Sequence, residues 1–581
     1  MNFSFVDYAG IFNQITLHIR IAFSGRLQII QSFLLFVFFI APQLTNAQST
    51  LFQQGSKEYI LLDRLEIKMQ KDSNLNFSVF KPYNRQWWAA ALEKATLGAD
   101  ELKLSAIDRY NLSSAKLNNL EWTSRGKPYV ESKKPLLKTF YKDPANFLLV
   151  NQSDFFLSIN PVLQLQGMRD NKSDQFHYLN SRGLAIRSQL GNRIGFQAYV
   201  TENLERPPVF ARNEYDTYRA VPGAGLYKRY KETGYDSWDA RGSIYIKPTK
   251  YLDVQLGHDK IFIGNGYRSL FISDQSASHA YLNLNFRAWK FNYSSRVMEL
   301  QPQYTRRGLG GDTLLWKKYA TIHYLNFSAT KWLNIGLFEG VVYGRQNRFE
   351  VNYLNPIIFL RAAELNVGSP DNSFIGFDVK ANLAKRVQVY GQVMLDEFYT
   401  KFIKERKGWW ANKWAFQAGM KYIDAFGVNN LDLQLETNWI RPFVYSHFDT
   451  VANYTHYNQP LAHPLHSNVK EYIAIAKYQP APKWYMQLTS IYWRRGVDVN
   501  GVNYGNNIFR DSDTRPTQEG FFFFTPQVKN NYNVNYWVAY EPRENLFLEL
   551  NFTARKAGAE ALNSFGSIGV RLNMQRRQYD Y

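Results

Sequence analysis

From residue 155 onward, apolar and polar residues alternate along the chain with a period of two. In one such run Leu546, Leu548 and Leu550 alternate with Glu549 and Asn551. Successive side chains of a strand point to opposite faces, so this pattern predicts strands with one apolar and one polar face. About 18 such segments can be counted. They begin near residues 155, 184, 194, 238, 252, 280, 289, 319, 333, 374, 387, 414, 431, 471, 484, 531, 546 and 565.

The connections between these segments alternate in length. Short turns occur near 191–193 and 384–386, and long connections near 202–237, 344–373 and 495–530. Short turns at one end and long loops at the other are typical of outer-membrane barrels. A large soluble β-sandwich or propeller is the alternative, but the chain shows no repeat of roughly 40–50 residues, as blades would.

Residues 48–150 have a different periodicity. Apolar residues spaced by three or four predict one face of a helix, with Gly98 weakening its middle. They are Trp88, Leu92, Ala95, Ala99, Leu102, Ala106 and Tyr110. A second short helix is expected near 114–122, and the Lys- and Pro-rich stretch 127–144 resembles a linker.

The first 47 residues have the order of a secretory signal. Arg20 and Arg26 precede an apolar run at 33–40, and small residues follow up to Ala47. A membrane anchor is the alternative, but the run is shorter than the roughly 20 residues that a spanning helix needs.

The sequence thus predicts a signal peptide over 1–47, a periplasmic N-terminal portion with a helical plug over 48–150, and an outer-membrane β-barrel over 151–581. The fold class is an all-β transmembrane barrel of about 18 antiparallel strands with a small N-terminal helical periplasmic portion.

Composition narrows the chemistry. An aromatic share of 16% suits strands, and the absence of cysteine excludes disulfides and thiolate metal sites. The formal charge is +20, and removing Arg20 and Arg26 against Asp7 leaves 20 − 1 = +19 on the mature chain. A basic exported protein favours acidic polysaccharide or anionic lipid as partner over nucleic acid, although the charges also suit solvated loops.

Several segments resemble the capsule-assembly Wzi family. The block GHDKIFIGNGYRSLFISD at 257–274 is similar to its signature, and residues 353–380 and 58–68 resemble other regions of its Bacteroidota members. With NEYDTYRAVPGAGLYK at 213–228, the likeness is greatest to the gliding-motility RemB branch. The resemblance implies an 18-stranded outer-membrane barrel plugged by a periplasmic helical portion. It also implies a lectin activity that holds capsular polysaccharide, and a role in gliding.

The 257–274 block carries the polar groups His258, Asp259, Arg268 and Asp274 after a predicted strand. One interpretation is a loop that contacts sugar or closes the lumen, with His258 and Arg268 as carbohydrate-binding residues. The other is a loop folded inward and stabilised by ion pairs, in which Asp274 takes part.

The segment 353–380 carries Arg361, Glu364 and Asp371. Paired carboxylates could indicate glycoside hydrolysis, but acid–base pairing with Arg361 is the favoured interpretation, so these residues are predicted to form structural loop ion pairs.

A third candidate is the Trp409-Trp410 pair between Lys407 and Lys413. Aromatic faces stack on sugar rings and basic groups meet uronic acids, so these four residues are predicted to bind carbohydrate. An interfacial aromatic belt is the alternative.

The sequence therefore predicts a non-enzymatic outer-membrane barrel at the cell surface that binds or organises capsular polysaccharide, with a pore or transporter for an anionic solute as the alternative. No cofactor and no metal site are expected. The expected partners are surface polysaccharide, outer-membrane lipid, and gliding or capsule-export machinery, but not nucleic acid.

Overall fold

A computed structural model shows one closed antiparallel barrel of 18 strands. It describes residues 50–581 except 53–54, 71, 125, 128–130, 134, 192, 305–313, 346–347 and 358. The predicted signal peptide, residues 1–47, lies outside the described residues. The predicted fold class is therefore confirmed.

Each barrel strand pairs with its neighbours in chain order, and β26 closes the sheet on β5. Two short strands, β4 (Leu148–Asn151) and β8 (Tyr227–Tyr230), add to β5 and β9. The barrel strands are β5 (Phe155–Asp170), β6 (Ser173–Leu190), β7 (Ile194–Arg206), β9 (Gly234–Ile246), β10 (Leu252–Asp259), β12 (His279–Ala288), β13 (Phe291–Leu300), β14 (Lys318–Ser328), β15 (Leu333–Tyr343), β16 (Asn372–Leu383), β17 (Val387–Glu397), β18 (Lys413–Tyr422), β19 (Leu431–Ile440), β22 (Val469–Tyr478), β23 (Trp484–Val497), β24 (Gln527–Arg543), β25 (Leu546–Ala557) and β26 (Asn563–Leu572).

The outer face of the wall is apolar and the inner face is polar. In β25, Leu548 and Leu550 are 47% and 57% exposed, whereas Glu549 between them is buried toward the lumen. A continuous belt of such exposed apolar side chains would be costly in water and is favourable in lipid. The barrel is thus of the transmembrane kind. Every helix among the described residues is too short or too polar to cross a bilayer.

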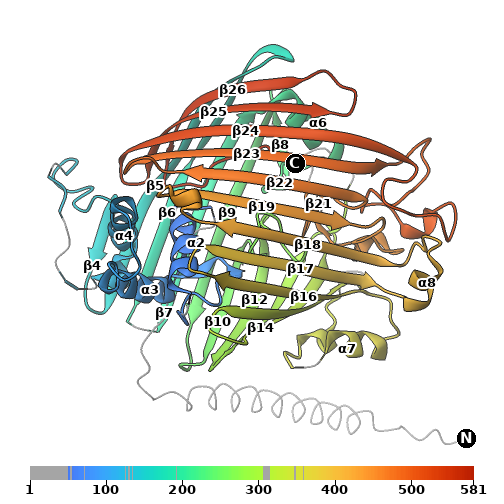
Figure 1. Ribbon diagram of the computed structural model, residues 1–581, viewed down its shortest axis with the longest axis horizontal. Helices are drawn as coiled ribbons and strands as arrows, with labels where there is room; N and C mark the ends of the chain where they lie inside the picture. The colour runs from blue at the N-terminus through green and yellow to red at the C-terminus, as the bar shows by residue number, and fades with distance from the viewer. Residues whose placement is uncertain are drawn as a thin grey trace, which may run out of the picture.

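The two ends of the barrel differ (Figure 1). Turns such as 384–386 and 544–545 close one end, which we call the short-turn end. Connections such as 344–371, 398–412 and 498–526 lie at the other, the long-loop end. This is the predicted asymmetry of loop lengths.

Four helices precede the barrel and pack on one another. They are α2 (Glu58–Met69), α3 (Arg85–Leu97), α4 (Ala106–Leu117) and α5 (Leu120–Thr123). Asn84 caps α3 by accepting from the amides of Gln86 and Trp87, and Ser105 begins α4 with a capping box. Leu92, Ala95 and Ala99 are buried in their shared core, as the spacing predicts.

The single helix expected over residues 88–110 is wrong in one respect. The α3 helix ends at Leu97, Gly98 follows as its C-cap, and the chain turns before α4 begins at Ala106. Glycine favours helix ends over helix interiors, because it loses more backbone entropy than other residues when it is held in a helix.

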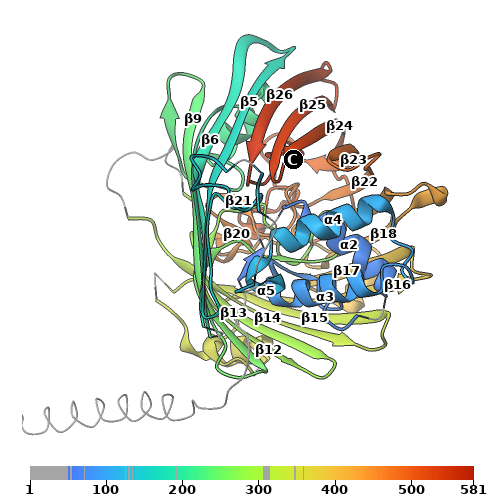
Figure 2. The ribbon, with the colours of Figure 1, turned by 90° about the vertical axis from the view of Figure 1, so that its left-hand side faces the viewer.

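These helices, which we call the plug, are attached to the short-turn end (Figure 2). Ser105 Oγ donates to Asn430 at 2.6 Å, and Asn111 donates to Gln479 at 2.7 Å. Arg64 of α2 forms ion pairs with Asp424 and Asp432 of the barrel. The plug is therefore fixed by polar contacts to two short turns and to strand β19.

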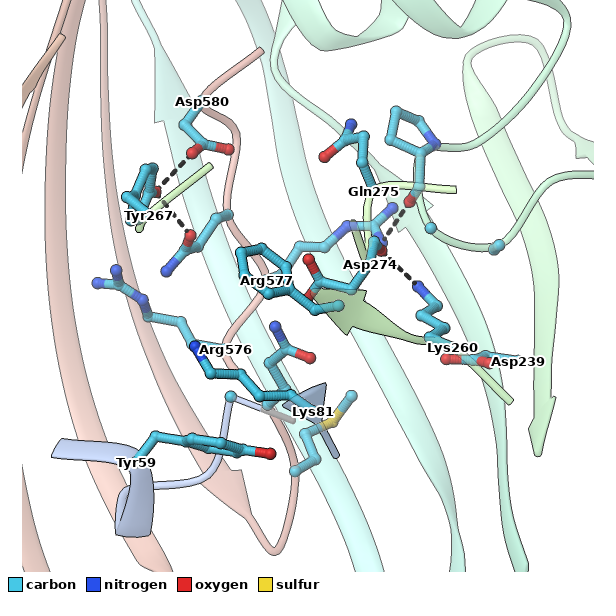
Figure 3. Close-up of a pocket in the computed structure, with 18 of the residues that line it drawn as sticks. Tyr59, Lys81, Asp239, Lys260, Tyr267, Asp274, Gln275, Arg576, Arg577 and Asp580 are labelled. Atoms are coloured by element: carbon cyan, nitrogen blue, oxygen red, sulfur yellow. Dashed lines mark hydrogen bonds between the residues drawn. The ribbon is translucent and has the colours of Figure 1, made fainter. Parts of the chain in front are cut away.

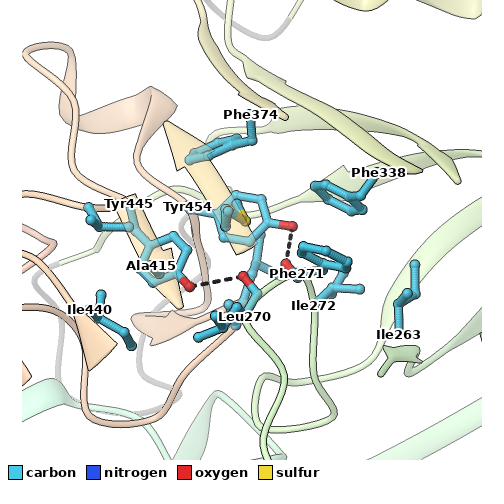
Figure 4. Close-up of a cluster of buried hydrophobic side chains, with 14 of the residues drawn as sticks. Ile263, Leu270, Phe271, Ile272, Phe338, Phe374, Ala415, Ile440, Tyr445 and Tyr454 are labelled. Atoms are coloured by element: carbon cyan, nitrogen blue, oxygen red, sulfur yellow. Dashed lines mark hydrogen bonds between the residues drawn. The ribbon is translucent and has the colours of Figure 1, made fainter. Parts of the chain in front are cut away.

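Residues 260–278, which we call the inner loop, fold into the lumen. Their short strand β11 (Phe262–Ile263) pairs with β2 (Phe80–Lys81) of the segment that joins α2 to α3. Two inward-folded tyrosines of the 441–468 connection hold the loop, since Tyr445 and Tyr454 donate to the carbonyls of Leu270 and Phe271 at 2.9 and 2.7 Å (Figure 4). Residues 260–274 of the 257–274 block thus occupy the lumen, whereas 257–259 end strand β10 of the wall.

The C-terminal residues 573–581, the tail, also return into the lumen after β26. The Asn533 side chain donates to the carbonyl of Tyr579 at 3.1 Å, and Arg577 pairs with Glu205 at 2.7 Å. Tyr581 is buried. The terminal aromatic residue is therefore part of the lumen filling, beyond the last strand.

Remaining short elements are β1 (Leu51–Phe52), β3 (Tyr83–Asn84), α6 (Val209–Tyr218), η1 (Val351–Leu354), α7 (Leu360–Asn366), α8 (Thr400–Glu405), η2 (Ala425–Gly427), η3 (Thr450–Ala452), β20 (Thr455–His456), β21 (Gln459–Pro460) and η4 (Ser512–Thr514).

Candidate functional site

An aromatic and basic array lies at the long-loop end, on residues 398–412, which we call the rim loop. Phe402 stacks on Trp409 with ring centroids 4.1 Å apart, and the Arg515 guanidinium lies 3.7 Å above the Trp410 ring. Figure 1 places α8, which begins the rim loop, at the end of the barrel opposite the plug. The two tryptophans are half-buried, so part of each ring remains accessible.

The rim loop is fixed by the neighbouring connection 498–526. The amides of Gly520 and Phe521 donate to the carbonyls of Lys407 and Gly408 at 2.8 and 2.9 Å. Gly408 has φ +72, and a Cβ there would lie 2.9 Å from the Phe521 amide nitrogen. Glycine is thus required where the two loops meet.

The basic residues near the tryptophans fall into two groups. Lys401, Lys404, Arg406 and Lys407 are exposed on the rim loop. Lys413 is not: it is the first residue of β18, is 1% exposed, and binds Glu397 at 2.9 Å and Asp396 at 3.6 Å. The ammonium group of Lys413 still lies 5.1 Å from the centre of the Trp410 ring, and the guanidinium of Arg515 lies over the same ring.

The two other predicted carbohydrate-binding residues do not join this array. His258 is exposed on the outer face of β10, where Nδ1 lies 2.9 Å from the Ala240 carbonyl. Arg268 is buried in the lumen, with Glu471 at 3.3 Å and Asp580 at 3.1 Å. The position of Arg268 therefore fits the second interpretation of the 257–274 block, in which the loop folds inward and is stabilised by ion pairs.

The residues predicted to form structural ion pairs lie in two places. Arg361 of α7 pairs with Glu364 at 2.6 Å, and α7 packs through Leu360 on the outer face of β15. Asp371 pairs with Arg345 at the start of the same connection, not with Arg361. Asp274 belongs to the inner loop, where its backbone carbonyl accepts from Lys260 at 3.3 Å. Contrary to the prediction, its carboxylate lies in no salt bridge with a residue that the structure describes.

A second place with concentrated charge is a cavity of about 340 Å³ in the lumen (Figure 3). It is enclosed by the plug, the inner loop, the tail and the inner faces of strands on both sides. Its charged lining comprises eight cationic residues and four carboxylates, a surplus of four positive charges. The cations are Lys81, Arg241, Lys260, Arg268, Lys421, Lys477, Arg576 and Arg577, and the carboxylates are Asp63, Asp239, Asp274 and Asp580.

Burial changes the protonation of two of these lysines. Burial, reinforced by Lys421, lowers the pKa of Lys81 to about 8. Burial, reinforced by Arg241, likewise lowers the pKa of Lys260 to about 8. Desolvation disfavours the charged form of a lysine, and neighbouring cations add to the effect.

Of the cavity residues, Arg268 and Asp274 are among those that the sequence singles out. The wall lysines Lys421 and Lys477 occupy polar positions of the dyad pattern, which marks them as inward-facing. Arg576 and Arg577 follow the last strand, and no pattern there predicts a tail that turns inward.

The fold and these two places define a transmembrane β-barrel whose lumen is occupied by its own plug, inner loop and tail, with a basic aromatic array on its long-loop rim. Scans of protein-family models and of curated proteins find no match for the chain.

Among solved structures, the chain is similar to Wzi, an outer-membrane protein involved in group 1 capsule assembly in Escherichia coli and described as a carbohydrate-binding β-barrel. The TM-score is 0.55 at 14% identity, over 91% of this chain and 100% of that one. At that identity the likeness shows a shared barrel fold. OprD from Pseudomonas aeruginosa matches with a TM-score of 0.40 at 11% identity, over 71% of this chain and 94% of that one. OccAB4 from Acinetobacter baumannii matches with 0.41 at 8%, over 72% and 98%.

Proposed function

We propose that the protein is a non-enzymatic outer-membrane barrel that binds an anionic surface polysaccharide on its long-loop rim. The observation that carries the proposal is the rim array, in which two accessible tryptophans adjoin exposed Lys401, Lys404 and Lys407. Its placement at the end opposite the plug leaves it free of the segments that fill the lumen.

The array suits a repeating acidic polymer. Aromatic faces pack on the apolar faces of sugar rings, and lysine or arginine groups attract uronic carboxylates. Each contact is weak, but a polymer meets several at once and gains avidity. Both cations beside Trp410 are already paired, Lys413 with Glu397 and Asp396, and Arg515 with Asp513. The exposed lysines of the rim loop are therefore the cations proposed to meet the polymer.

The cellular placement belongs to the same proposal. A signal peptide at 1–47 would export the chain, the plug and short turns would face the periplasm, and the long loops would face outward. The sequence resemblance to the capsule-assembly family and the fold shared with Wzi support it. A part in gliding, with gliding or capsule-export machinery as partner, rests on the sequence resemblance alone.

The rim array is tested by replacing Trp409 and Trp410 together with alanine. Retention of surface polysaccharide, measured by flow cytometry of intact cells, should fall about tenfold, because two aromatic contacts of roughly 0.5–1.5 kcal/mol each are lost. Binding by the unaltered protein should also weaken at about 1 M salt, where the screening length is roughly 3 Å.

The matched control is Trp289→Ala, which removes a tryptophan that is 79% exposed on a turn at the opposite end. It should leave retention unchanged. Normal retention by the double variant, together with binding that ignores salt, would contradict the proposed site and mechanism.

A pore for an anionic solute is distinguished by conductance in planar bilayers. The plug, the inner loop and the tail all occupy the lumen, so the full-length protein should give no large steady current. A large steady current from the intact protein would favour the pore over the polysaccharide-binding barrel.

A further inference from the structure

Four cations of the lumenal cavity lie in no salt bridge with a described residue, and one of them, Lys260, donates to the backbone carbonyl of Asp274 at 3.3 Å. The other three carry the argument. Lys81, Lys477 and Arg576 each line the cavity, and none of them lies in a salt bridge with any residue that the structure describes. In addition, Arg576 Nη1 is buried without a hydrogen-bond partner among those residues. By contrast Lys421 is paired with Asp63 at 2.9 Å.

The three cations come from three separate parts of the chain. Lys81 belongs to β2 beside the plug, Lys477 to the barrel wall, and Arg576 to the tail. Figure 3 shows Lys81 and Arg576 on the same side of the cavity as Tyr59, with Lys260 and Asp239 on the opposite side. A folded chain that gathers unneutralised cations around a void raises its own electrostatic energy, which a bound anion would lower.

We propose that this cavity binds a small molecule bearing a carboxylate or phosphate group, held by Lys81, Lys477 and Arg576. The volume of about 340 Å³ lies at the lower end of the range for small-molecule pockets. The lining is rich in polar and charged groups, which suits a hydrophilic anion such as an acidic sugar or a phosphate. The site is distinct from the rim array and does not depend on it.

Such a ligand would connect the plug to the wall and the tail. Because it would bind the assembled lumen and not separated parts, it would stabilise the closed state by a free energy that rises with the logarithm of its concentration over its Kd. The cavity would thereby make docking of the plug depend on a periplasmic or extracellular anion.

The pH dependence of binding follows from Lys81. It is faced by Asp63 and Glu66 from α2, Lys421 from β18 and Lys380 from β16, and its pKa is about 8 without ligand. An anion raises that pKa, so binding takes up a proton and affinity should fall as pH rises above about 8.

Isothermal titration of the full-length protein in detergent tests the site, with inorganic phosphate in one arm and glucuronate in the other. We expect saturable one-to-one binding in at least one arm, which also tells a phosphate ligand from a carboxylate ligand. Lys81→Met and Arg576→Met should each weaken it about tenfold or more, since each removes a charge-assisted contact. Lys331→Met, which removes an exposed charge from a turn, should leave it unchanged.

Absence of binding in both arms would overturn the proposal. Equal binding by Lys81→Met, Arg576→Met and the control Lys331→Met would also overturn it. The Trp409 and Trp410 double variant should bind both anions normally, so failure at the rim and failure in the cavity are told apart. Thermal melting of each variant without ligand shows whether a lost signal reflects misfolding. Should Lys81→Met unfold, Lys477→Gln provides the second measurement.

Discussion

Replacing Arg64 with methionine should release the plug from the barrel mouth. Arg64 is 2% exposed and binds Asp108 of α4 at 2.9 Å and Asp424 of the barrel at 2.8 Å, with Asp432 as a third partner. Removing one side of a buried ion pair typically costs roughly 3–5 kcal/mol, because the remaining charge is left without its partner. Lys68 still contacts Asp424 at 2.7 Å, so we expect about 3 kcal/mol.

The measurement is limited proteolysis of the protein in detergent, followed by mass spectrometry. Cleavage within the plug should become faster by about a hundredfold, since 1.36 kcal/mol corresponds to a factor of ten. The barrel should stay uncut. Arg109→Met is the control, because its pair with Asp100 on the plug surface is half exposed and worth little. Equal cleavage in both variants would show that Arg64 does not hold the plug.

The ion pair between Arg64 and Asp424 also makes docking of the plug weaker at low pH. Burial opposes ionisation of Asp424, but Arg64 and Lys68 outweigh it and lower its pKa to about 2. A depressed carboxylate pKa stabilises the docked state above the undocked value of about 3.9, and this contribution is lost as pH falls toward 2. Proteolysis of the unaltered plug by an acid protease should therefore accelerate over this range, and Arg64→Met should respond less.

The barrel could be predicted because lipid imposes a pattern on every strand. Predicted and observed strand starts coincide at 155, 194, 252, 333, 387, 431, 484 and 546. The largest error is β6, which begins at Ser173 and not near 184. Its first residues are exposed polar groups such as Asp174 and Gln175, so no apolar face marks that part of the strand.

The lumen could not be predicted in the same way. Contacts such as Tyr267 with Asp580 join residues far apart in the chain, and no spacing in the sequence encodes their distance. Lys413 shows that an error of one residue in a predicted strand boundary changes whether a side chain is assigned to a loop or to the inner face of the wall. The pattern places Lys413 in the loop because it predicts the next strand near 414, but β18 begins one residue earlier and directs the Lys413 side chain inward. Trp409 and Trp410 lie in the loop where the pattern places them, and their binding of carbohydrate stays a prediction.

Glu436, a wall residue of β19, holds the inner loop. Its carboxylate accepts from the amides of Tyr267 and Arg268 at 2.6 and 3.0 Å. A Cβ at Gly266 would collide with the same carboxylate, so the close approach requires glycine. The Arg268 side chain then reaches Glu471 and the tail, so one short segment joins the wall, the loop and the C-terminus.

Arg268→Met should therefore loosen the inner loop and the tail together. The substitution leaves the carboxylate of fully buried Glu471 without its arginine partner, although His463 remains 2.8 Å and Asn438 2.9 Å from it. We expect a loss of roughly 3–5 kcal/mol in the stability of the closed lumen. Hydrogen exchange of residues 260–274 and 574–581 should accelerate in parallel, while the strands keep their protection.

Arg361→Met, which removes a half-exposed arginine outside the barrel, should change neither segment. Adding Glu471→Gln to Arg268→Met should cost less than the sum of the two single changes, because the second removes the stranded charge. Additive losses of stability, or faster exchange in one segment alone, would contradict the inference that Arg268 holds both segments in place.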